Sequence, residues 1–195
     1  MDSASSILLA SASPRRAELL QQIGVHFQAL PVDIDESPRA GEAALEFVQR
    51  LALEKAQAGY LQTGNGRPVL GSDTIVVVDE QILGKPTDRD DALRMLGLLS
   101  GRGHQVMTAV ALVDGQKVAR ALNVSQVYFR SLQPSEIEAY WNTGEAVDKA
   151  GAYGIQGIAA QFIERLDGSY SGVMGLPLFE TAQLLQQFGI VTLGQ

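Results

Sequence analysis

The most apolar stretch of this chain runs from Val69 to Val78 and contains one carboxylate near its centre, Asp73. The stretch is short, rich in β-branched residues and without a helical period, so it predicts a buried strand. An unpaired carboxylate in such a strand is costly even after the protein relaxes around it. Asp73 should therefore be paired with a cation, exposed at a bend, or bound to a metal ion. From this segment alone, a Ser-Asp turn between two strands is an equal alternative to a chemical role.

The order of predicted elements indicates a mixed α/β fold. Strand patterns and hairpin signals alternate with helical patterns, which excludes a purely parallel doubly wound sheet and predicts a mixed sheet flanked by helices. Thr87 and Asp90 resemble a capping box at one helix start, and residues 168–177 read as a loop. We predict helices over 14–23, 41–61, 87–100, 134–142 and 176–188, and strands over 6–10, 25–31, 69–78, 106–113 and 118–129.

Composition limits the classes of function. With 195 residues, 46% of them hydrophobic, the chain is expected to form one globular domain over 1–195. The absence of cysteine excludes disulfides and thiolate metal sites. The first residues lack a basic leader and no apolar run has membrane-spanning length, so we expect a cytoplasmic protein without a membrane partner. A net charge of −7 argues against nucleic-acid polymers but allows a small phosphorylated ligand.

The start of the first predicted helix carries an unusual pair of cations. Ser13 is a plausible N-cap and Pro14 fits the first helical position. Arg15 and Arg16 follow, where the helix dipole disfavours positive charge. Together with the free backbone N–H groups of a helix start, these side chains favour a phosphate site. The alternative is that both arginines face water or pair with acids such as Glu18.

Two lysines extend this possible phosphate site. Lys55 lies on the apolar stripe of the helix predicted over 41–61 and should be buried. Snorkelling to the surface is its commoner explanation, and a position facing bound phosphate is the sharper one. Lys85 lies in a Gly-Lys-Pro loop and by itself gives only a weak signal.

An acidic loop offers a second carboxylate. Glu36 lies beside Asp33 and Asp35, and composition alone does not separate the three. If the loop folds toward Asp73, two carboxylates from different segments would supply oxygen ligands suited to Mg²⁺ or Mn²⁺. The alternative is a solvated acidic cluster. Gln156, in the glycine-rich stretch 151–157, is its one polar side chain at a tight turn, and a surface turn explains that stretch equally well.

Taken together, these segments resemble the Maf family of nucleoside triphosphate pyrophosphatases. The resemblance covers nearly the whole chain in order, and residues 151–157 are similar to the branch acting on dTTP and UTP. The motifs that carry it are Ser11-x-Ser13-Pro14-Arg15-Arg16, Asp35-Glu36, the Lys55 helix, Ser72-Asp73-Thr74, Gly84-Lys85-Pro86, Ser100-Gly101 through His104 to Thr108, Asp148-Lys149-Ala150-Gly151 and Gly175-Leu176-Pro177. Ser171-Gly172-Val173-Met174 departs from the Asn-Val-Val type of sequence usual before Gly-Leu-Pro.

The resemblance implies two lobes around a central nucleotide-binding cleft, similar to inosine triphosphate pyrophosphatases. It implies that Asp73 accepts a proton and that Arg15, Thr74 and Gln156 set substrate specificity. Phosphate contacts are expected from Ser13, Arg15, Arg16, Lys55 and Lys85, and a Mg²⁺ or Mn²⁺ ion on Glu36 and Asp73.

The implied reaction is hydrolysis of dTTP, UTP and modified pyrimidine nucleotides to the nucleoside monophosphate and pyrophosphate. This is a house-cleaning activity linked to cell-division arrest, and a homodimer is compatible with the resemblance. Two other classes remain open. One is a nucleotide-binding regulator of septum formation in which turnover is incidental, and the other is a phosphatase for small phosphoesters.

Overall fold

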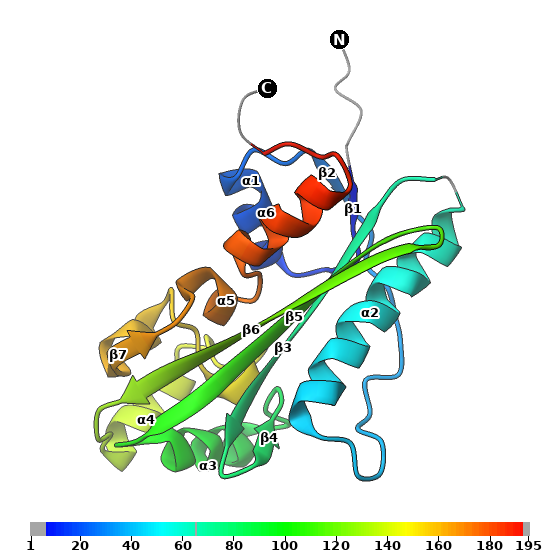
Figure 1. Ribbon diagram of the computed structural model, residues 1–195. Helices are drawn as coiled ribbons and strands as arrows, with labels where there is room; N and C mark the ends of the chain where they lie inside the picture. The colour runs from blue at the N-terminus through cyan, green and yellow to red at the C-terminus, as the bar shows by residue number, and fades with distance from the viewer. Residues whose placement is uncertain (1–6, 65, 193–195) are drawn as a thin grey trace. The chain divides into compact units, whose positions relative to one another are not determined.

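The computed structural model describes residues 7–64 and 66–192 (Figure 1). Ser6, the first residue of the strand predicted over 6–10, lies outside this range. The elements in chain order are β1 (Ile7–Leu9), α1 (Pro14–Gln22), β2 (Phe27–Ala29), α2 (Ala44–Thr63), β3 (Val69–Val78), β4 (Gln81–Leu83), α3 (Arg89–Leu99), β5 (Gly103–Asp114), β6 (Lys117–Phe129), α4 (Pro134–Trp141), the short 3₁₀ helices η1 (Ala150–Ala152) and η2 (Ile158–Phe162), β7 (Ile163–Asp167), α5 (Tyr170–Met174) and α6 (Leu178–Gln187).

One mixed sheet connects the strands, as predicted. Its order is β2-β1-β3-β5-β6-β7, with β4 paired to β3. β1 runs parallel to both β2 and β3, whereas β4 is antiparallel to β3 and β7 is antiparallel to β6. β5 and β6 are the two longest strands and are neighbours in the sheet (Figure 1). The predicted mixed sheet with flanking helices is confirmed.

The chain divides into two compact units. The first comprises Met1–Asp73, Thr108–Asn123 and Gly175–Gln195, and the second comprises Thr74–Met107 and Val124–Met174. The division falls within β3, β5 and β6. Whether the chain acts as one domain with a cleft stays a prediction.

In the first unit, α2 packs directly on β3. A side chain at Gly71 would overlap the backbone of α2 at Ala52 and Ala56, so only glycine allows this close approach. Alternate residues of a strand point to the same face, so Gly71 and Asp73 share the face that contacts α2. On the helix, Lys55 lies beside Ala56 on the same buried side. This packing sets the lysine opposite the carboxylate.

The second unit has its own core, formed largely by α3, α4 and the aromatic side chains around Phe129. Phe129 and Tyr153 make an edge-to-face contact with ring centroids 4.8 Å apart. His104 is buried there, and its Nε2 lies 2.8 Å from the Tyr153 hydroxyl. Burial is the main cause that lowers the pKa of His104 to about 4, so the ring is neutral at pH 7.

Two local predictions are wrong. The N-cap of α3 is Asp88, whose carboxylate accepts from the Asp91 N–H at 2.8 Å, so the cap lies one residue later than the Thr87 and Asp90 pattern suggests. The predicted 168–177 loop contains the short helix α5. A single cap residue and a helix of five residues are both too short to show a periodic pattern in the sequence.

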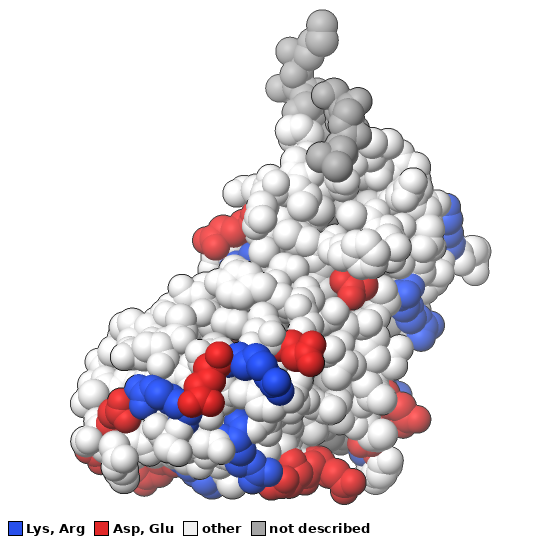
Figure 2. Space-filling model, turned by 60° about the vertical axis from the view of Figure 1, so that its left-hand side comes forward, with Lys and Arg blue, Asp and Glu red and all other residues white. Residues whose placement is uncertain are grey.

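Charged side chains of both signs lie next to one another on the face shown in Figure 2. Ion pairs at the surface of the second unit include Arg130–Glu136 at 2.7 Å and Arg89–Glu138 at 2.9 Å. Within 7–64 and 66–192, no helix combines the length and the apolar character needed to cross a membrane.

Candidate active site

A buried ion pair joins α2 to β3 in the first unit. The Lys55 ammonium lies 2.7 Å from Oδ1 of Asp73, and the two side chains are only 10% and 9% exposed. The apolar strand therefore contains a paired carboxylate rather than a turn. Lys55 does not snorkel to the surface, because its charge is neutralised inside the protein. The prediction that Asp73 is paired with a cation and the prediction that Lys55 is buried are both consistent with this contact.

Glu36 reaches the same lysine from the acidic loop. Its Oε1 lies 2.9 Å from the Lys55 ammonium, and its side chain is 54% exposed. The neighbouring Asp35 has a local role, because its Oδ1 accepts from the Ser37 N–H at 2.9 Å. The structure thus separates Glu36 from the other acidic residues of the loop. The Lys55 ammonium therefore pairs with the buried carboxylate of Asp73 and with the solvent-accessible carboxylate of Glu36.

Burial raises the pKa of the Asp73 carboxyl above its ordinary value of 3.8. The charges of Lys55 and Arg16 counteract this shift, and the nearby Glu36 charge adds to it. A carboxylate with a raised pKa is, when ionised, a stronger proton acceptor than an ordinary aspartate. The direction of the shift is compatible with the predicted general base, and that role stays a prediction.

The start of α1 is tied to the last segment of the first unit. The Arg16 Nε donates to the Gly175 carbonyl at 2.8 Å, and its Nη1 donates to the Ser11 hydroxyl at 3.2 Å. Ser72, adjacent to Asp73, donates to the same Gly175 carbonyl at 3.0 Å. Arg16 is therefore held by protein contacts rather than by water, and its charge acts on Asp73 from a fixed position.

Ser13 occupies the N-cap position of α1, as predicted, but its side chain makes no capping hydrogen bond. Its own N–H donates to the Ser11 hydroxyl at 3.1 Å. Arg15 follows in the first turn of α1, which itself contains no acidic residue. These features are compatible with anion binding at the helix start, and phosphate contacts from Ser13, Arg15 and Arg16 stay predictions.

The remaining predicted residues belong to the second unit. Thr74 follows Asp73 directly in β3 and is partly buried, whereas Lys85 and Gln156 are exposed. Gln156 lies in a turn closed by a hydrogen bond from the Gly157 N–H to the Gly154 carbonyl at 3.1 Å. Their roles toward a nucleotide stay predictions.

The donor set at Asp73 and Glu36 fits a magnesium or manganese ion. Each carboxylate has one oxygen on Lys55 and a second oxygen that could bind a cation. Mg²⁺ commonly uses one or two carboxylates and completes its coordination with water and substrate phosphates. In the part of the chain that the structure describes, no group of three or more His, Cys, Asp or Glu residues could hold an ion unaided. The pair therefore suits a metal that arrives with phosphate.

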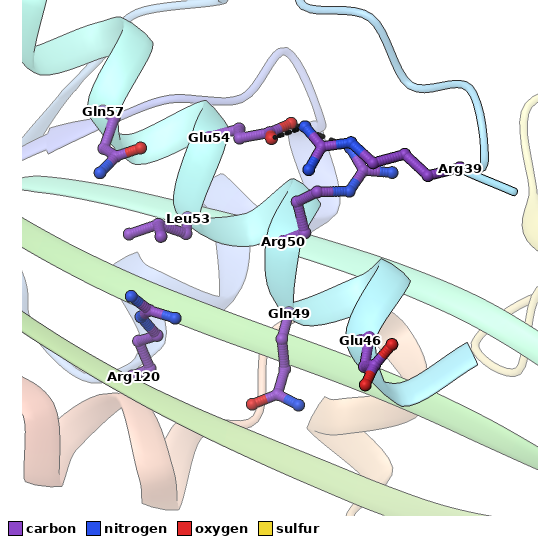
Figure 3. A pocket seen from close by; sticks show the side chains of 8 residues that line it. All are labelled: Arg39, Glu46, Gln49, Arg50, Leu53, Glu54, Gln57 and Arg120. Carbon is purple, nitrogen blue, oxygen red and sulfur yellow. Dashed lines mark hydrogen bonds and ion pairs between the residues drawn. The ribbon is translucent and has the colours of Figure 1, made fainter. Parts of the chain in front are cut away.

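A shallow pocket of about 440 Å³ lies elsewhere in the first unit, beside α2 (Figure 3). Its lining consists of Arg39, Glu46, Gln49, Arg50, Leu53, Glu54, Gln57 and Arg120. Arg39 and Arg50 converge on Glu54, with N–O distances of 2.8 and 3.0 Å. The pocket contains none of the predicted site residues, and two of its three arginines are already neutralised. We therefore locate the candidate active site at Asp73.

Sequence analysis missed the Gly175 carbonyl, which orients both Arg16 and Ser72. Gly175 has φ 118°, a conformation that favours glycine. The glycine-rich segment before α6 was the available signal, but sequence gives no indication of which carbonyl faces the site.

Comparison with known proteins gives a consistent result. The model of the family described as Maf-like protein matches residues 6–188. A dTTP/UTP pyrophosphatase from Alkalilimnicola ehrlichii is 57% identical, with 94% of this chain and 93% of that protein covered. A dTTP/UTP pyrophosphatase from Chromobacterium violaceum is 52% identical, with 94% of each chain covered. Among solved structures, a HAM1 protein from Coxiella burnetii aligns with a TM-score of 0.45 at 20% identity, over 63% of this chain and 72% of that one.

Proposed function

This chain belongs to the Maf family, and from that membership and the geometry at Asp73 we propose that it hydrolyses dTTP and UTP to the nucleoside monophosphate and pyrophosphate. The observation that carries the proposal is the buried Lys55–Asp73 ion pair, because it places a carboxylate with a raised pKa beside a fixed cation. The substrate class is supported by the shared name of the similar relatives, dTTP/UTP pyrophosphatase.

Asp73 has the role of general base. It accepts a proton from the water molecule that attacks the α phosphorus, while the bond from that phosphorus to the bridging oxygen breaks. The bridging oxygen leaves with the β and γ phosphates as pyrophosphate. Lys55 keeps Asp73 ionised by its positive charge, and its placement against Glu36 fixes the ammonium.

The cations at the start of α1 stabilise the negative charge of the triphosphate. Charge develops on the phosphoryl oxygens and on the leaving pyrophosphate, so catalysis depends on positioned positive groups. Arg15 is one of these cations, and Ser13 and Lys85 provide further contacts to the phosphates. When bound to Asp73 and Glu36, a divalent metal would neutralise phosphate charge and orient the phosphoryl groups.

Selectivity for the base is assigned to Gln156, with Arg15 and Thr74 as further specificity residues. The Gln156 amide offers one donor group and one acceptor, which complement the N–H and carbonyl edge of uracil and thymine. Gln156 is exposed without nucleotide, and a polar group that the bound nucleotide covers but the wrong base leaves unpaired discriminates strongly. Gln156→Ala should therefore lose selectivity while the metal requirement remains.

Release of pyrophosphate from a panel of nucleoside triphosphates tests the proposal. With Mg²⁺, the protein should convert UTP and dTTP to monophosphate and pyrophosphate faster than ATP or GTP. Asp73→Asn should reduce kcat by about 10²- to 10⁴-fold, the range of general-base catalysis. The matched control is Asp90→Asn, at a side chain that is 89% exposed on α3, which should turn over normally.

Two results would contradict the proposal. Tight nucleotide binding without turnover, by both the wild type and Asp73→Asn, would favour a regulator. Orthophosphate as the first product would favour a phosphatase.

We also propose a cytoplasmic location, consistent with a chain that lacks cysteine. A homodimer and the link to cell-division arrest are proposed from family resemblance alone.

A further inference from the structure

The turn that carries Gln156 is held by a polar pair in the second unit, the buried Tyr140 and the half-buried Glu145. Ile155 and Gln156 occupy the middle of the turn, between Gly154 and Gly157. Gln156 is exposed, whereas Gly154 and Ile155 before it are buried. An exposed side chain at a two-residue tip has a defined direction only if the backbone on both sides is held.

Tyr140 and Glu145 hold both sides. The Gly154 N–H donates to the Tyr140 hydroxyl at 3.3 Å, and that hydroxyl donates to Glu145 Oε1 at 2.8 Å. After the turn, the Ile158 N–H donates to Glu145 Oε2 at 2.8 Å, and the Ala159 N–H donates to Oε1 at 3.3 Å. Every one of these bonds ends on one carboxylate or on the hydroxyl bound to it.

The sequence of the turn is adapted to this carboxylate. A Cβ atom at Gly157 would overlap the carboxylate of Glu145, so a side chain there would displace this carboxylate from its present position. Lys149 donates to the Glu145 carbonyl at 2.6 Å and anchors the backbone of the same residue. Burial and the neighbouring Glu145 raise the pKa of Tyr140, which therefore stays protonated and able to donate.

We propose that Glu145 and Tyr140 are positioning residues for base selectivity, because they fix the turn that presents Gln156. This inference rests on the proposed function, in which Gln156 reads the base. Neither residue needs to touch the nucleotide. Their effect is to limit the directions available to the Gln156 amide, so that a pyrimidine is bound without first ordering the turn.

Glu145→Gln tests the proposal with almost no change in size. The new amide places an NH₂ group where a carboxylate oxygen accepted a backbone N–H, so one side of the turn loses its acceptor. We expect the kcat/KM ratio of UTP over GTP to fall about tenfold, through a higher KM for UTP, the size of effect typical of one lost charge-assisted hydrogen bond. Tyr140→Phe should give a smaller fall, of about threefold.

A matched control is Glu138→Gln on α4, the helix that carries Tyr140. Its carboxylate pairs with Arg89 at 2.9 Å on the surface. This variant should keep the wild-type ratio. Hydrogen exchange adds a readout independent of turnover: Glu145→Gln should speed exchange at the Gly154 and Ile158 amides while the β6 amides stay protected.

The double variant Glu145→Gln/Gln156→Ala separates this inference from the proposed function. If Glu145 acts through Gln156, the double variant should show the UTP/GTP ratio of Gln156→Ala alone. A normal ratio in Glu145→Gln alongside a lost ratio in Gln156→Ala would overturn the positioning role and leave Gln156 as the reader of the base. An unchanged ratio in Gln156→Ala would overturn both. A uniform fall in kcat for all nucleotides would show that Glu145 is only structural.

Discussion

The Asp73 carboxylate is subject to two opposing influences, burial that favours its neutral form and two cations that favour its charged form. Burial is the larger influence, so the pKa lies above 3.8. Between 3.8 and the raised pKa the folded state binds more protons than the unfolded state, so stability falls as pH rises through this range, and above it the buried, ionised Asp73 costs stability. A residue that reduces stability in its working state is typical of an active site rather than of a structural core.

The pH profile of kcat/KM should report this carboxylate. As pH falls through the Asp73 pKa, the base becomes protonated and activity is lost, so the acid limb should lie above the range of an ordinary aspartate. Lys55→Met removes the cation that keeps Asp73 ionised, and the limb should move to higher pH. Lys117→Met, at a lysine bound to the Gln187 carbonyl, is the control and should leave the midpoint in place. A midpoint unchanged by Lys55→Met would show that Asp73 is not the group titrating.

Sequence indicates Asp73, Lys55 and Arg16 as candidate site residues but not the contacts that they make. Asp73 was singled out because a charge in an apolar strand requires an explanation, and Lys55 because it interrupts an apolar helical stripe. Their ion pair joins segments 18 residues apart and depends on how closely α2 approaches β3. Arg16 binds a carbonyl 159 residues away, a contact that no local pattern could predict.

Among the elements, β3 was predicted with both of its ends correct because an apolar, β-branched run has a strong pattern. The short elements between α4 and α6 were missed. η1, η2 and α5 contain three to five residues each, too few for a periodic signal, and side chains such as Glu145 contribute to their order. A long element contains enough residues to show a periodic pattern in the sequence, whereas elements of three to five residues do not and depend on tertiary contacts.

The start of α3 gives a test of the observed cap. Asp88→Ala should lower the free energy of unfolding by about 1 kcal/mol, because it removes the acceptor for the Asp91 N–H. Thr87→Ala is the comparison, since Thr87 is the cap that the sequence pattern predicts, and it should have a much smaller effect. Urea unfolding of both variants measures the difference. A larger loss in Thr87→Ala would contradict the structure.

The close approach of α2 to β3 gives a second test. Gly71→Ala would place a methyl group against the α2 backbone at Ala52 and Ala56, and overpacking of this kind costs about 1 to 3 kcal/mol or more. Gly97→Ala is the matched control on α3, where nothing lies within 4 Å of the added atom, and it should stabilise the helix by about 1 kcal/mol. Because Gly71 shares a strand face with Asp73, its variant should also lose activity. Equal stability of the two variants would contradict the packing.

At the scale of the whole molecule, the net charge of −7 makes a triphosphate an unexpected guest unless positive charge is concentrated locally. Arg15 and Arg16 are proposed to supply some of that charge and a divalent metal to supply more, because Lys55 already pairs with two carboxylates. Composition allows a small phosphorylated ligand without predicting one, and the family match supports such a ligand. Oligomeric state has no comparable signal in the sequence.

Metal dependence follows from the small donor set. Two carboxylates that share a lysine should bind Mg²⁺ weakly without nucleotide and more tightly when phosphate oxygens complete the coordination. Calorimetry should therefore detect little Mg²⁺ binding to the free protein and clear binding in the presence of a non-hydrolysable UTP analogue. Chelation should stop turnover, and added Mg²⁺ or Mn²⁺ should restore it. Tight metal binding to the free protein would point to a different set of ligands.

The most direct test of attack at the α phosphorus, with Asp73 as base, is hydrolysis of UTP in water enriched in ¹⁸O. Attack on that phosphorus should place the label in uridine monophosphate and leave pyrophosphate unlabelled, and Asp73→Asn should slow formation of the labelled product without changing its position. Label found in pyrophosphate or in orthophosphate would show that water attacks a different phosphorus and would contradict the proposed mechanism.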